Sequence, residues 1–433
     1  MTASPQQTFP PQSTSATCCI VGGGPAGIML GFLLARAGVD VLVLEKHKDF
    51  FRDFRGDTIH PSTLQIMHEL GLLDQLLQLP HQKMTEGTAH FGPRVLRMGD
   101  FTRLRSRCKF IAFMPQWDFL SFLASHARKF PTFRLRMETQ VTDLLFDRDR
   151  VIGVKASTPD GPLEVRANLV VGADGRGSTL RDRAGLEVID SGSPIDVLWF
   201  RVTRHADDPP TAGGSYYIGA RQFMVLINRD AYWQCAYVIR KGSFPQQQQR
   251  GVETFRQDVA RCVPFLAGRT DQIKDWDDVK LLSVKVDHLR TWHRDGLLCI
   301  GDAAHAMSPI AGVGINLAIQ DAVASANLLA PQLLEKSPHV GSETLASVQR
   351  RRQPPARMIQ RMQILLHKHL LEKIFDSPDL IRPPMFMRMA DWFPKLQHVT
   401  GRAIGIGLRP EHVQTRAEEI SRQRTERIAE AKA

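Results

Sequence analysis

The chain has 433 residues, of which 43% are hydrophobic and 23% are charged. This composition is typical of globular proteins and excludes a disordered chain, a collagen-like fibre and a small disulfide scaffold, and the length allows roughly two to three domains. Lysine and arginine number 56 against 45 acidic residues, which gives a net charge of +11. An anionic partner is therefore expected, whether nucleic acid, a membrane surface or a small molecule.

The N-terminal residues 1–16 are rich in Ser, Thr, Pro and Gln and lack the basic and apolar segments of a secretory signal. They predict a short disordered leader. The six cysteines form no CxxC pair and lie mostly in apolar runs, which favours a reducing compartment. No run of about 18 apolar residues is present, so a cytoplasmic protein is expected.

The pattern from residue 17 onward predicts an α/β fold. A short apolar run, a glycine cluster, an alanine- and leucine-rich stretch and the run 39–45 read as strand, turn, helix and strand. Helices are expected before residue 79 and over 116–130, and the alternation over 133–171 predicts an antiparallel meander. Residues 191–290 are the most strand-like part. A strand, a turn and a long helix over about 312–334 follow, and then a basic helical region in which Pro354, Pro355, Pro383 and Pro384 are expected to break helices.

The first chemistry-bearing motif is GlyGlyGlyProAlaGly, with Gly22, Gly24 and Gly27 between a predicted strand and a predicted helix. Glycines allow a tight turn and close approach of the backbone to a pyrophosphate, and the helix start supplies amide donors. Glu45 ends the next strand, 18 residues beyond Gly27, where a carboxylate can accept hydrogen bonds from ribose hydroxyls.

Two further glycine turns follow predicted strands. One contains Asp174 and Gly175, which alone indicates only a turn. The other contains Gly301 and Asp302 and leads through Pro309 to the long helix. Its Asp can hold a ribose or ribityl hydroxyl, and the helix start can direct amides at an electron-rich carbonyl.

With these three motifs in this order, residues 17–345 resemble the class A flavoprotein monooxygenases, the family of 4-hydroxybenzoate hydroxylase and the ubiquinone-pathway hydroxylases. The resemblance implies a Rossmann-like FAD-binding domain (17–87, 105–190 and 283–350), an inserted antiparallel-sheet domain for substrate (88–104 and 191–282) and a basic helical C-terminal region (351–433). The FAD contacts that it implies, with Arg55 and Gln116 added by their position, are Gly22, Gly24, Pro25, Ala26, Gly27, Glu45, Arg55, Gln116, Asp174, Gly175, Gly301, Asp302, Pro309, Gly312, Gly314, Ile315 and Asn316.

The resemblance also implies the reaction. NADH or NADPH would bind transiently and reduce the FAD, and molecular oxygen would then reach an aromatic or conjugated substrate through a C4a-hydroperoxyflavin. Alternating aromatic residues in the sheet domain form either a pocket wall or ordinary core: Trp199, Tyr217, Phe223, Trp233 and Tyr237. No catalytic base is identified; Tyr217, His60 and His288 are candidates by residue type alone.

Two alternatives remain open. One is a flavin oxidase, dehydrogenase or halogenase, although a halogenase is disfavoured because the chain has no TrpxTrp sequence. The other is a non-catalytic flavin-binding scaffold, since GlyValGly stands where the family commonly has GlyGlnGly. No metal-ligand spacing is present.

The positive charge is concentrated at the C-terminal end. Residues 350–433 contain 17 Lys and Arg against 9 Asp and Glu. The stretch 356–375 combines apolar and basic residues, so it can lie on an anionic membrane or pack its apolar side on the catalytic domains. The catalytic part is nearly balanced in charge. This distribution favours FAD and NAD(P)H as anionic partners and argues against nucleic acid, and the oligomeric state stays open.

Overall fold

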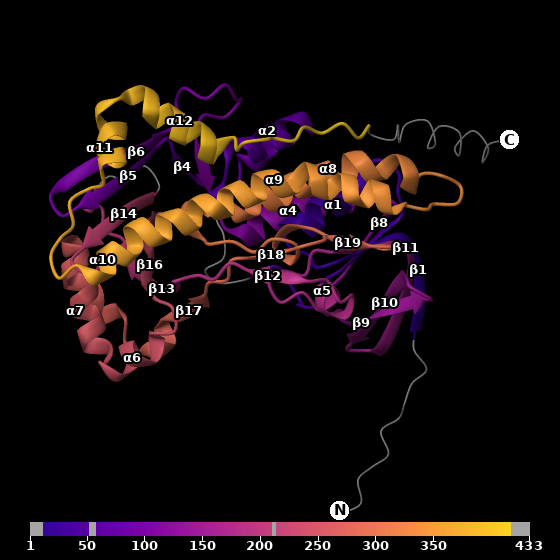
Figure 1. Cartoon of the computed structure of the whole chain (residues 1–433), viewed down its shortest axis with the longest axis horizontal. Helices are drawn as coiled ribbons and strands as arrows, with labels where there is room; N and C mark the ends of the chain where they lie inside the picture. Colours follow the sequence, from indigo (N-terminus) through magenta and orange to yellow (C-terminus); the bar gives the residue numbers. More distant parts are fainter. Residues whose placement is uncertain (1–11, 52–57, 210–213, 417–433) are drawn as a thin grey trace, which may run out of the picture.

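The computed structural model describes residues 12–51, 58–209 and 214–416. The first of its two large sheets has eight strands, in which β1 lies between β11 and β2 and all three run parallel. Figure 1 shows this sheet at one end of the molecule. The strands of this sheet are β1 (Gln12–Val21), β2 (Val41–Leu44), β8 (Phe133–Arg136), β9 (Gln140–Asp147), β10 (Arg150–Thr158), β11 (Gly161–Gly172), β19 (His293–Arg294) and β20 (Leu297–Cys299).

The α/β fold class is confirmed, with the parallel strands β20, β11, β1, β2 and β8 at its centre. One face of the sheet is covered by apolar helices, and the other by the meander of β9 and β10. The meander starts at β9, because β8 pairs with β2 as a parallel strand. The helices of the chain are α1 (Pro25–Arg36), α2 (Pro61–Glu69), α3 (Leu73–Leu76), α4 (Gln116–Ala127), α5 (Thr179–Arg183), α6 (Phe244–Gln249), α7 (Val252–Cys262), α8 (Gly314–Leu333), α9 (Ser342–Leu366), α10 (Glu372–Asp376), α11 (Met385–Trp392) and α12 (Pro394–Gly405).

The predicted leader over 1–16 is wrong for residues 12–16, which belong to strand β1. Gln12 to Ala16 pair in register with Leu163 to Ala167 of β11. The long neighbouring strand supplies backbone partners, so these Ser- and Thr-rich residues join the sheet although few of their side chains are buried.

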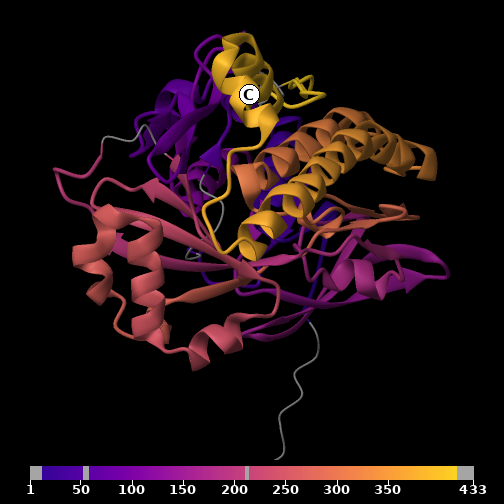
Figure 2. The same cartoon turned by 60° about the vertical axis from the view of Figure 1, so that its left-hand side comes forward.

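The second large sheet has seven strands, and two of them, β5 and β6, come from a segment far before the other five in the sequence. β5 pairs with β14 in parallel, and the other neighbours are antiparallel. Figure 2 shows the helices of residues 244–262 on the outer side of this sheet. In order across the sheet, the strands are β17 (Lys280–Ser283), β13 (Ile195–Thr203), β16 (Tyr232–Arg240), β15 (Gln222–Asn228), β14 (Gly214–Gly219), β5 (Glu86–Phe91) and β6 (Arg94–Asp100).

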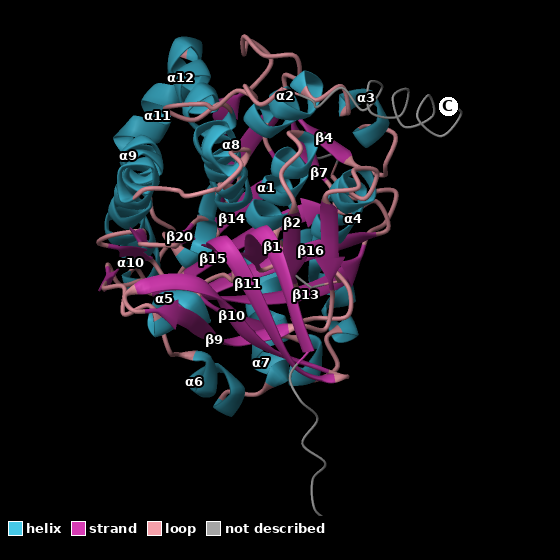
Figure 3. Ribbon diagram, turned by 90° about the vertical axis from the view of Figure 1, so that its right-hand side faces the viewer, coloured by secondary structure: helices cyan, strands magenta, loops and turns pink. Residues whose placement is uncertain are grey.

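Two small sheets join these parts. Strand β7 lies between β3 and β4, and β12 pairs with β18. Figure 3 shows all the strands in magenta with the helices packed around them. The bounds of these short strands are β3 (Thr58–Ile59), β4 (Gln82–Met84), β7 (Ile111–Phe113), β12 (Val188–Asp190) and β18 (Asp287–Leu289).

Helix α8 is the central helix of the first domain. Residues 310–333 are long and apolar enough to cross a membrane, but 78% of that window is buried inside the protein. α8 packs on α1 and α9, and α1 in turn approaches the sheet closely at Gly31, where a Cβ would lie 2.8 Å from Val43 Cγ2. The apolar character of α8 is thus explained by its place in the core.

The prediction that Pro354 and Pro355 break a helix is wrong, because α9 runs through both of them. The predicted boundary between residues 350 and 351 therefore falls inside one helix. Each interior proline costs roughly 3 kcal/mol, and the buried contacts that α9 makes on either side of them offset this cost.

The strongest of these contacts is a buried charge network around Arg352. Its Nε donates to Asp321 Oδ1 in α8 at 3.0 Å, and its guanidinium lies 3.2 Å from Glu411 Oε1. Asp321 Oδ2 also lies 2.5 Å from His305 Nε2 and accepts from the Gly301 amide. All three side chains of the Asp321–Arg352–Glu411 set are at most 1% exposed. The network therefore fastens α8, α9 and the segment around Glu411, which follows α12, to the Gly301 turn.

Arg352→Met tests this fastening. The change removes one of the two cationic partners of the buried Asp321 and Glu411, which keep His305 and Arg351, and we expect the free energy of unfolding to fall by about 3 kcal/mol in denaturant titrations. The matched control is Arg350→Met, whose partner Glu343 is on the surface, and which should cost at most about 1 kcal/mol. Equal effects of the two substitutions would contradict the assignment.

Candidate active site

The first glycine turn joins β1 to α1. Gly22 has φ +106°, and a Cβ there would lie 2.3 Å from the Ala173 carbonyl oxygen. A Cβ at Gly27 would lie 1.9 Å from the Gly22 carbonyl oxygen, whereas one at Gly24 would meet nothing within 4 Å. The first and third predicted glycines are thus required by packing. Gly24 instead faces open space at the helix start.

The start of α1 is free to receive an anion. Pro25 is its first residue, and no side chain caps Gly24. The first-turn amides and the positive end of the helix dipole are therefore directed at the space beside Gly24. Glu45 is buried at the end of β2, and its Oε2 accepts from the Gly23 amide at 2.8 Å while Oε1 accepts from the His47 amide at 3.0 Å. These two hydrogen bonds hold the Glu45 carboxylate, which can accept hydrogen bonds, against the same glycine turn.

The second turn holds Asp174 beside the first. Asp174 Oδ2 accepts from the Leu180 amide at 3.2 Å, while Oδ1 is buried and has no partner within the described part of the chain. Burial raises the pKa of Asp174, and hydrogen bonds from Ser178 and Leu180 lower it in part. Gly175 has φ +84°, which only glycine adopts without strain.

The third turn contacts the first directly. Gly301 has φ +60°, and a Cβ there would lie 3.2 Å from Ala26 Cβ at the start of α1. Asp302 Oδ2 accepts from Arg176 Nε at 3.1 Å, and both side chains are about one-third exposed. The structure thus brings the three predicted motifs to one place, and Arg176 joins the second turn to the third.

The loop from Pro309 to Asn316 is held against β3. Ala311 and Gly312 have φ of +65° and +62°, and a Cβ at Gly312 would lie 2.2 Å from Thr58 Oγ1. Thr58 Oγ1 donates to the Gly312 carbonyl at 2.8 Å. Asn316 accepts from the His60 amide and donates to the Thr58 carbonyl. The Asn316 side chain therefore holds the loop. It lies with Gly314 and Ile315 in the first turn of α8, which no side chain caps among the described residues.

A clamp from α9 holds the other side of this loop. Gln363 Nε2 donates to the Ser308 and Ile310 carbonyls at 3.0 and 3.1 Å, and its Oε1 accepts from the Ser308 amide. His367 Nε2 lies 3.0 Å from Ser308 Oγ, and Gln360 donates to the Ala306 carbonyl at 2.7 Å. These side chains are buried on one face of α9 and its continuation. The sequence reasoning missed them, because Arg357, Arg361 and Lys368 lie among them and the sequence does not set these polar residues apart from the basic ones.

For two of the predicted FAD contacts, the structure gives little or no information about the side chain. Gln116 opens α4, and Arg55 lies outside the described residues.

Among the base candidates, burial raises the pKa of Tyr217 to about 12 and lowers that of His60 to about 4. His288 is also shifted downward by burial and by Arg357. The structure does not place these three groups together.

The aromatic residues of the second sheet separate into two faces. Tyr217, Trp233 and Tyr237 pack under α7 in the core, so a pocket role for these three is wrong. Trp199 and Phe223 lie on the opposite face, in a cluster that also includes Ile310 of the loop. The period of two along each strand sends alternate residues to opposite faces, and the sequence did not show which face is covered.

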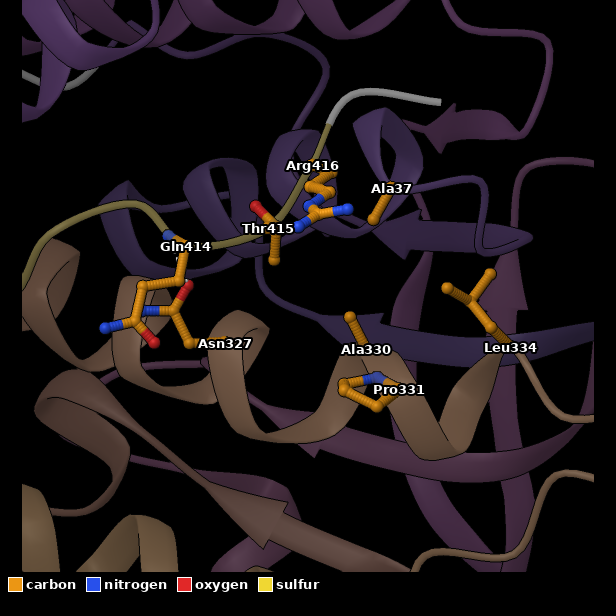
Figure 4. A pocket seen from close by; sticks show the side chains of 8 residues that line it. All are labelled: Ala37, Asn327, Ala330, Pro331, Leu334, Gln414, Thr415 and Arg416. Atoms are coloured by element: carbon orange, nitrogen blue, oxygen red, sulfur yellow. Dashed lines mark hydrogen bonds between the residues drawn. The ribbon is translucent and has the colours of Figure 1, made fainter. Parts of the chain in front are cut away.

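The hollow in Figure 4 is separate from this site. It has a volume of about 260 Å³ and lies between the ends of α1 and α8 and residues 414–416. It contains Ala37 and Leu334, which follow the C-terminal ends of the two helices, whereas the three turns gather at the N-terminal ends.

Comparison with known proteins identifies what this arrangement is. A family model described as an FAD binding domain matches residues 15–362. The chain belongs to this family of FAD-dependent monooxygenases. The 6-methylpretetramide 4-monooxygenase of Streptomyces rimosus is 32% identical over 371 residues, which cover 84% of this chain and 86% of that protein.

Two other relatives show the breadth of the family. The dialkyldecalin synthase of Streptomyces rugosporus is 28% identical over 317 residues, 71% of this chain and 64% of that protein. The crystal structure of p-nitrophenol 4-monooxygenase from Pseudomonas putida superposes with a TM-score of 0.73 at 20% identity, over 91% of this chain and 95% of that one. This last similarity shows the shared fold.

The residues present fit FAD. Among the described residues, nothing fills the space at Gly24 before the helix, which suits a pyrophosphate, and Glu45 offers oxygen acceptors to a ribose. Asp174 Oδ1, which has no partner in this described part, is buried beside them. The start of α8 offers amides to an electron-rich ring. FAD, with NADH or NADPH as electron donor, is the cofactor of this family.

Gln363→Leu tests the clamp. The substitution leaves the Ser308 amide and two carbonyls without their partner, and we expect the affinity of the apoprotein for FAD to fall about 10-fold to 100-fold, the equivalent of about 1–3 kcal/mol. Amide exchange over residues 306–316 should become faster. Gln234→Leu is the control, because Gln234 is equally buried but bonds Arg229 in the second sheet. Unchanged FAD titration and exchange in the first variant would disprove the clamp.

Asp174→Asn tests the buried carboxyl. Because folding raises its pKa, Asp174 favours the folded state at low pH, and this contribution is lost as pH rises through the raised pKa. The Asn variant of the apoprotein should therefore melt above the native protein at pH 8, and the difference should shrink as the pH falls to 4. Its affinity for FAD should fall about 10-fold. A variant that is less stable at pH 8 would contradict the assigned direction.

Proposed function

We propose that this protein uses NADH or NADPH and molecular oxygen to hydroxylate an aromatic or conjugated small molecule. The observation that carries the proposal is the meeting of the three turns, with Gly22 against Ala173 and Gly301 against Ala26. The 32% identity to a 6-methylpretetramide 4-monooxygenase over most of both chains supports this reaction class and makes 6-methylpretetramide the first substrate to test.

FAD, when bound, supplies the electron transfer and the activation of oxygen. The chain's own part is to bind and orient. The α1 start and Glu45 hold the nucleotide end, and Asp302 offers an acceptor to the ribityl chain once it exchanges its contact with Arg176. The amides of Gly314 and Ile315 stabilise negative charge without a mobile counter-ion.

The substrate side is assigned to the face of the second sheet that carries Trp199 and Phe223. Val225 of the same face and Ile310 of the loop belong to the surrounding apolar cluster. Such a surface suits a flat aromatic ring and excludes water from the reacting atoms. The sheet domain over 86–100, 195–209 and 214–283 is thus the proposed substrate domain, and residues 12–51, 58–85 and 101–194 with 284–366 form the proposed FAD domain.

A cytoplasmic location is part of the proposal. The six cysteines are buried and unpaired, as expected in a reducing compartment. A nucleic-acid partner is not proposed, because the positive charge is gathered in the C-terminal region.

A second candidate function is a reaction in which FAD is bound but oxygen is not inserted. The similarity to a dialkyldecalin synthase supports this second candidate function. An oxidase or dehydrogenase belongs to the same class, and a flavin-loaded scaffold without activity would share the site geometry. All of these retain FAD, so only the fate of electrons and oxygen separates them.

The test is reduction of the purified holoprotein by NADH or NADPH, with and without 6-methylpretetramide and simpler phenols. We expect substrate to accelerate flavin reduction at least about 10-fold and oxygen uptake to match hydroxylated product. Hydrogen peroxide without product would indicate an oxidase. Flavin that no nicotinamide reduces would favour the non-oxidative candidate.

The matched variant in this test is Asp302→Ala. It should weaken FAD retention by about 10-fold, the cost of one hydrogen bond to a charged group, while Asp295→Ala, on the loop between β19 and β20, should retain FAD fully. Full occupancy in Asp302→Ala would count against the proposed ribityl contact.

A further inference from the structure

Helices α11 and α12 carry a large apolar surface on their outer side. Figure 1 shows the two helices together at one end of the molecule, in yellow. Six large side chains on them are between 39% and 63% exposed: Met385, Met389, Trp392, Phe393, Leu396 and Val399. This set, the α11–α12 apolar surface, exceeds the scattered exposed apolar residues that are normal on a protein.

The inner side of the same helices is docked tightly. A Cβ at Gly401 would lie 2.2 Å from the Asp100 carbonyl oxygen, so α12 approaches strand β6 as closely as glycine permits. Thr400 Oγ1 donates to the Met98 carbonyl at 2.9 Å, and His60 Nδ1 lies 2.9 Å from the Ile404 carbonyl oxygen. The outward direction of the apolar residues is therefore fixed by specific contacts on the opposite side.

A cationic loop lies beside this surface. Residues 102–109 follow β6 and expose Arg103, Arg105, Arg107 and Lys109, none of which forms an ion pair with a carboxylate among residues 12–51, 58–209 and 214–416. A Cβ at Gly405 of α12 would lie 3.0 Å from Leu104 in this loop. The four cations also line a shallow hollow of about 570 Å³, together with Gln65 and His68.

We propose that the α11–α12 apolar surface and the loop 102–109 together bind the surface of an anionic phospholipid bilayer. Trp, Phe and Met side chains would enter the boundary between headgroups and acyl chains, and the loop cations would contact lipid phosphates. Arg388, whose guanidinium lies 5.1 Å from the Trp392 ring, is placed at the same boundary.

The positive charge of the loop 102–109 favours a bilayer over a second copy of the chain as the partner of this surface. A symmetric contact through this surface would bring the four cations of each copy towards those of the other, which is unfavourable. An anionic bilayer instead offers negative charge beside an apolar layer, which matches the arrangement of loop and helices. This inference differs from the one drawn from residues 356–375, because α9 buries Gln360, Gln363 and His367 on the protein.

Helix α12 lies between the α11–α12 apolar surface and the proposed substrate face. Ile404 and Ile406 on the inner side of α12 pack in the same apolar cluster as Trp199 and Val225. Delivery of a lipophilic substrate through the bilayer would rest on the proposed function, whereas lipid binding itself does not.

The experiment is co-sedimentation of the full chain with vesicles of phosphatidylcholine alone or with one-third phosphatidylglycerol. We expect at least about 10-fold stronger binding to the anionic vesicles and a blue shift of the emission of Trp392, the most exposed tryptophan. Trp392→Ala with Phe393→Ala should lower binding to the anionic vesicles at least 10-fold. Arg103→Gln, Arg105→Gln and Arg107→Gln together should abolish the preference for them.

The control variant is Phe146→Ser with Leu281→Ser, which removes two apolar side chains exposed to 41% and 45% elsewhere on the chain. It should bind vesicles as the native chain does, and circular dichroism should show that all variants are folded. Absence of binding to anionic vesicles would overturn the proposal. Dimerisation in light scattering that the Trp392 and Phe393 variant abolishes would also overturn it and assign the surface to a second copy. Failure here with intact hydroxylation would leave the proposed function standing.

Discussion

The Asp321 carboxylate is the contact on which the geometry of the site depends. It is fully buried in α8 and bonds three different parts of the chain: the Gly301 amide, His305 and Arg352. Burial lowers the pKa of His305, but the adjacent Asp321 outweighs it and the net shift is upward. The pKa of Asp321, which burial alone would raise, is lowered by His305 and Arg352. The carboxylate therefore stays charged inside the protein and sets the position of the Gly301 turn.

The loop that follows is positioned from two sides because its own backbone is unfavourable. Ala311 is a non-glycine residue at positive φ, and Gly312 admits no side chain against Thr58. Such conformations persist only where surrounding contacts determine them. Thr58 and Asn316 supply these contacts from β3 and α8, and Gln363 and His367 supply them from α9. Residues after position 350, such as Gln363 and His367, therefore help to position the site.

The sequence predicted the α/β class and the residues of the three turns because glycine spacing reflects a local steric requirement. Gly22, Gly27 and Gly301 each stand where a Cβ would strike the backbone or a neighbouring helix. Gln363 and His367 could not be found this way, since a buried polar residue in a helix has no local signature and its partner is over fifty residues away. For the same reason the sequence predicted a helix break at Pro354 and Pro355, where tertiary contacts offset the cost of the prolines. Assignment of Tyr217 and Trp233 to the core required knowing which face α7 covers.

The basic residues of the C-terminal region fall into two groups with different roles. Arg352 is buried and shares Glu411 with the partly exposed Arg351, so both serve as internal fasteners. Arg388 instead lies over the ring of the exposed Trp392 in α11, beside the other residues of the α11–α12 apolar surface. Net charge along the sequence cannot separate these cases, because the separation depends on which residues lie opposite in the fold. The basic C-terminal region therefore contains arginines that fasten α9 to α8 and to the segment around Glu411, and others that lie at an outward surface.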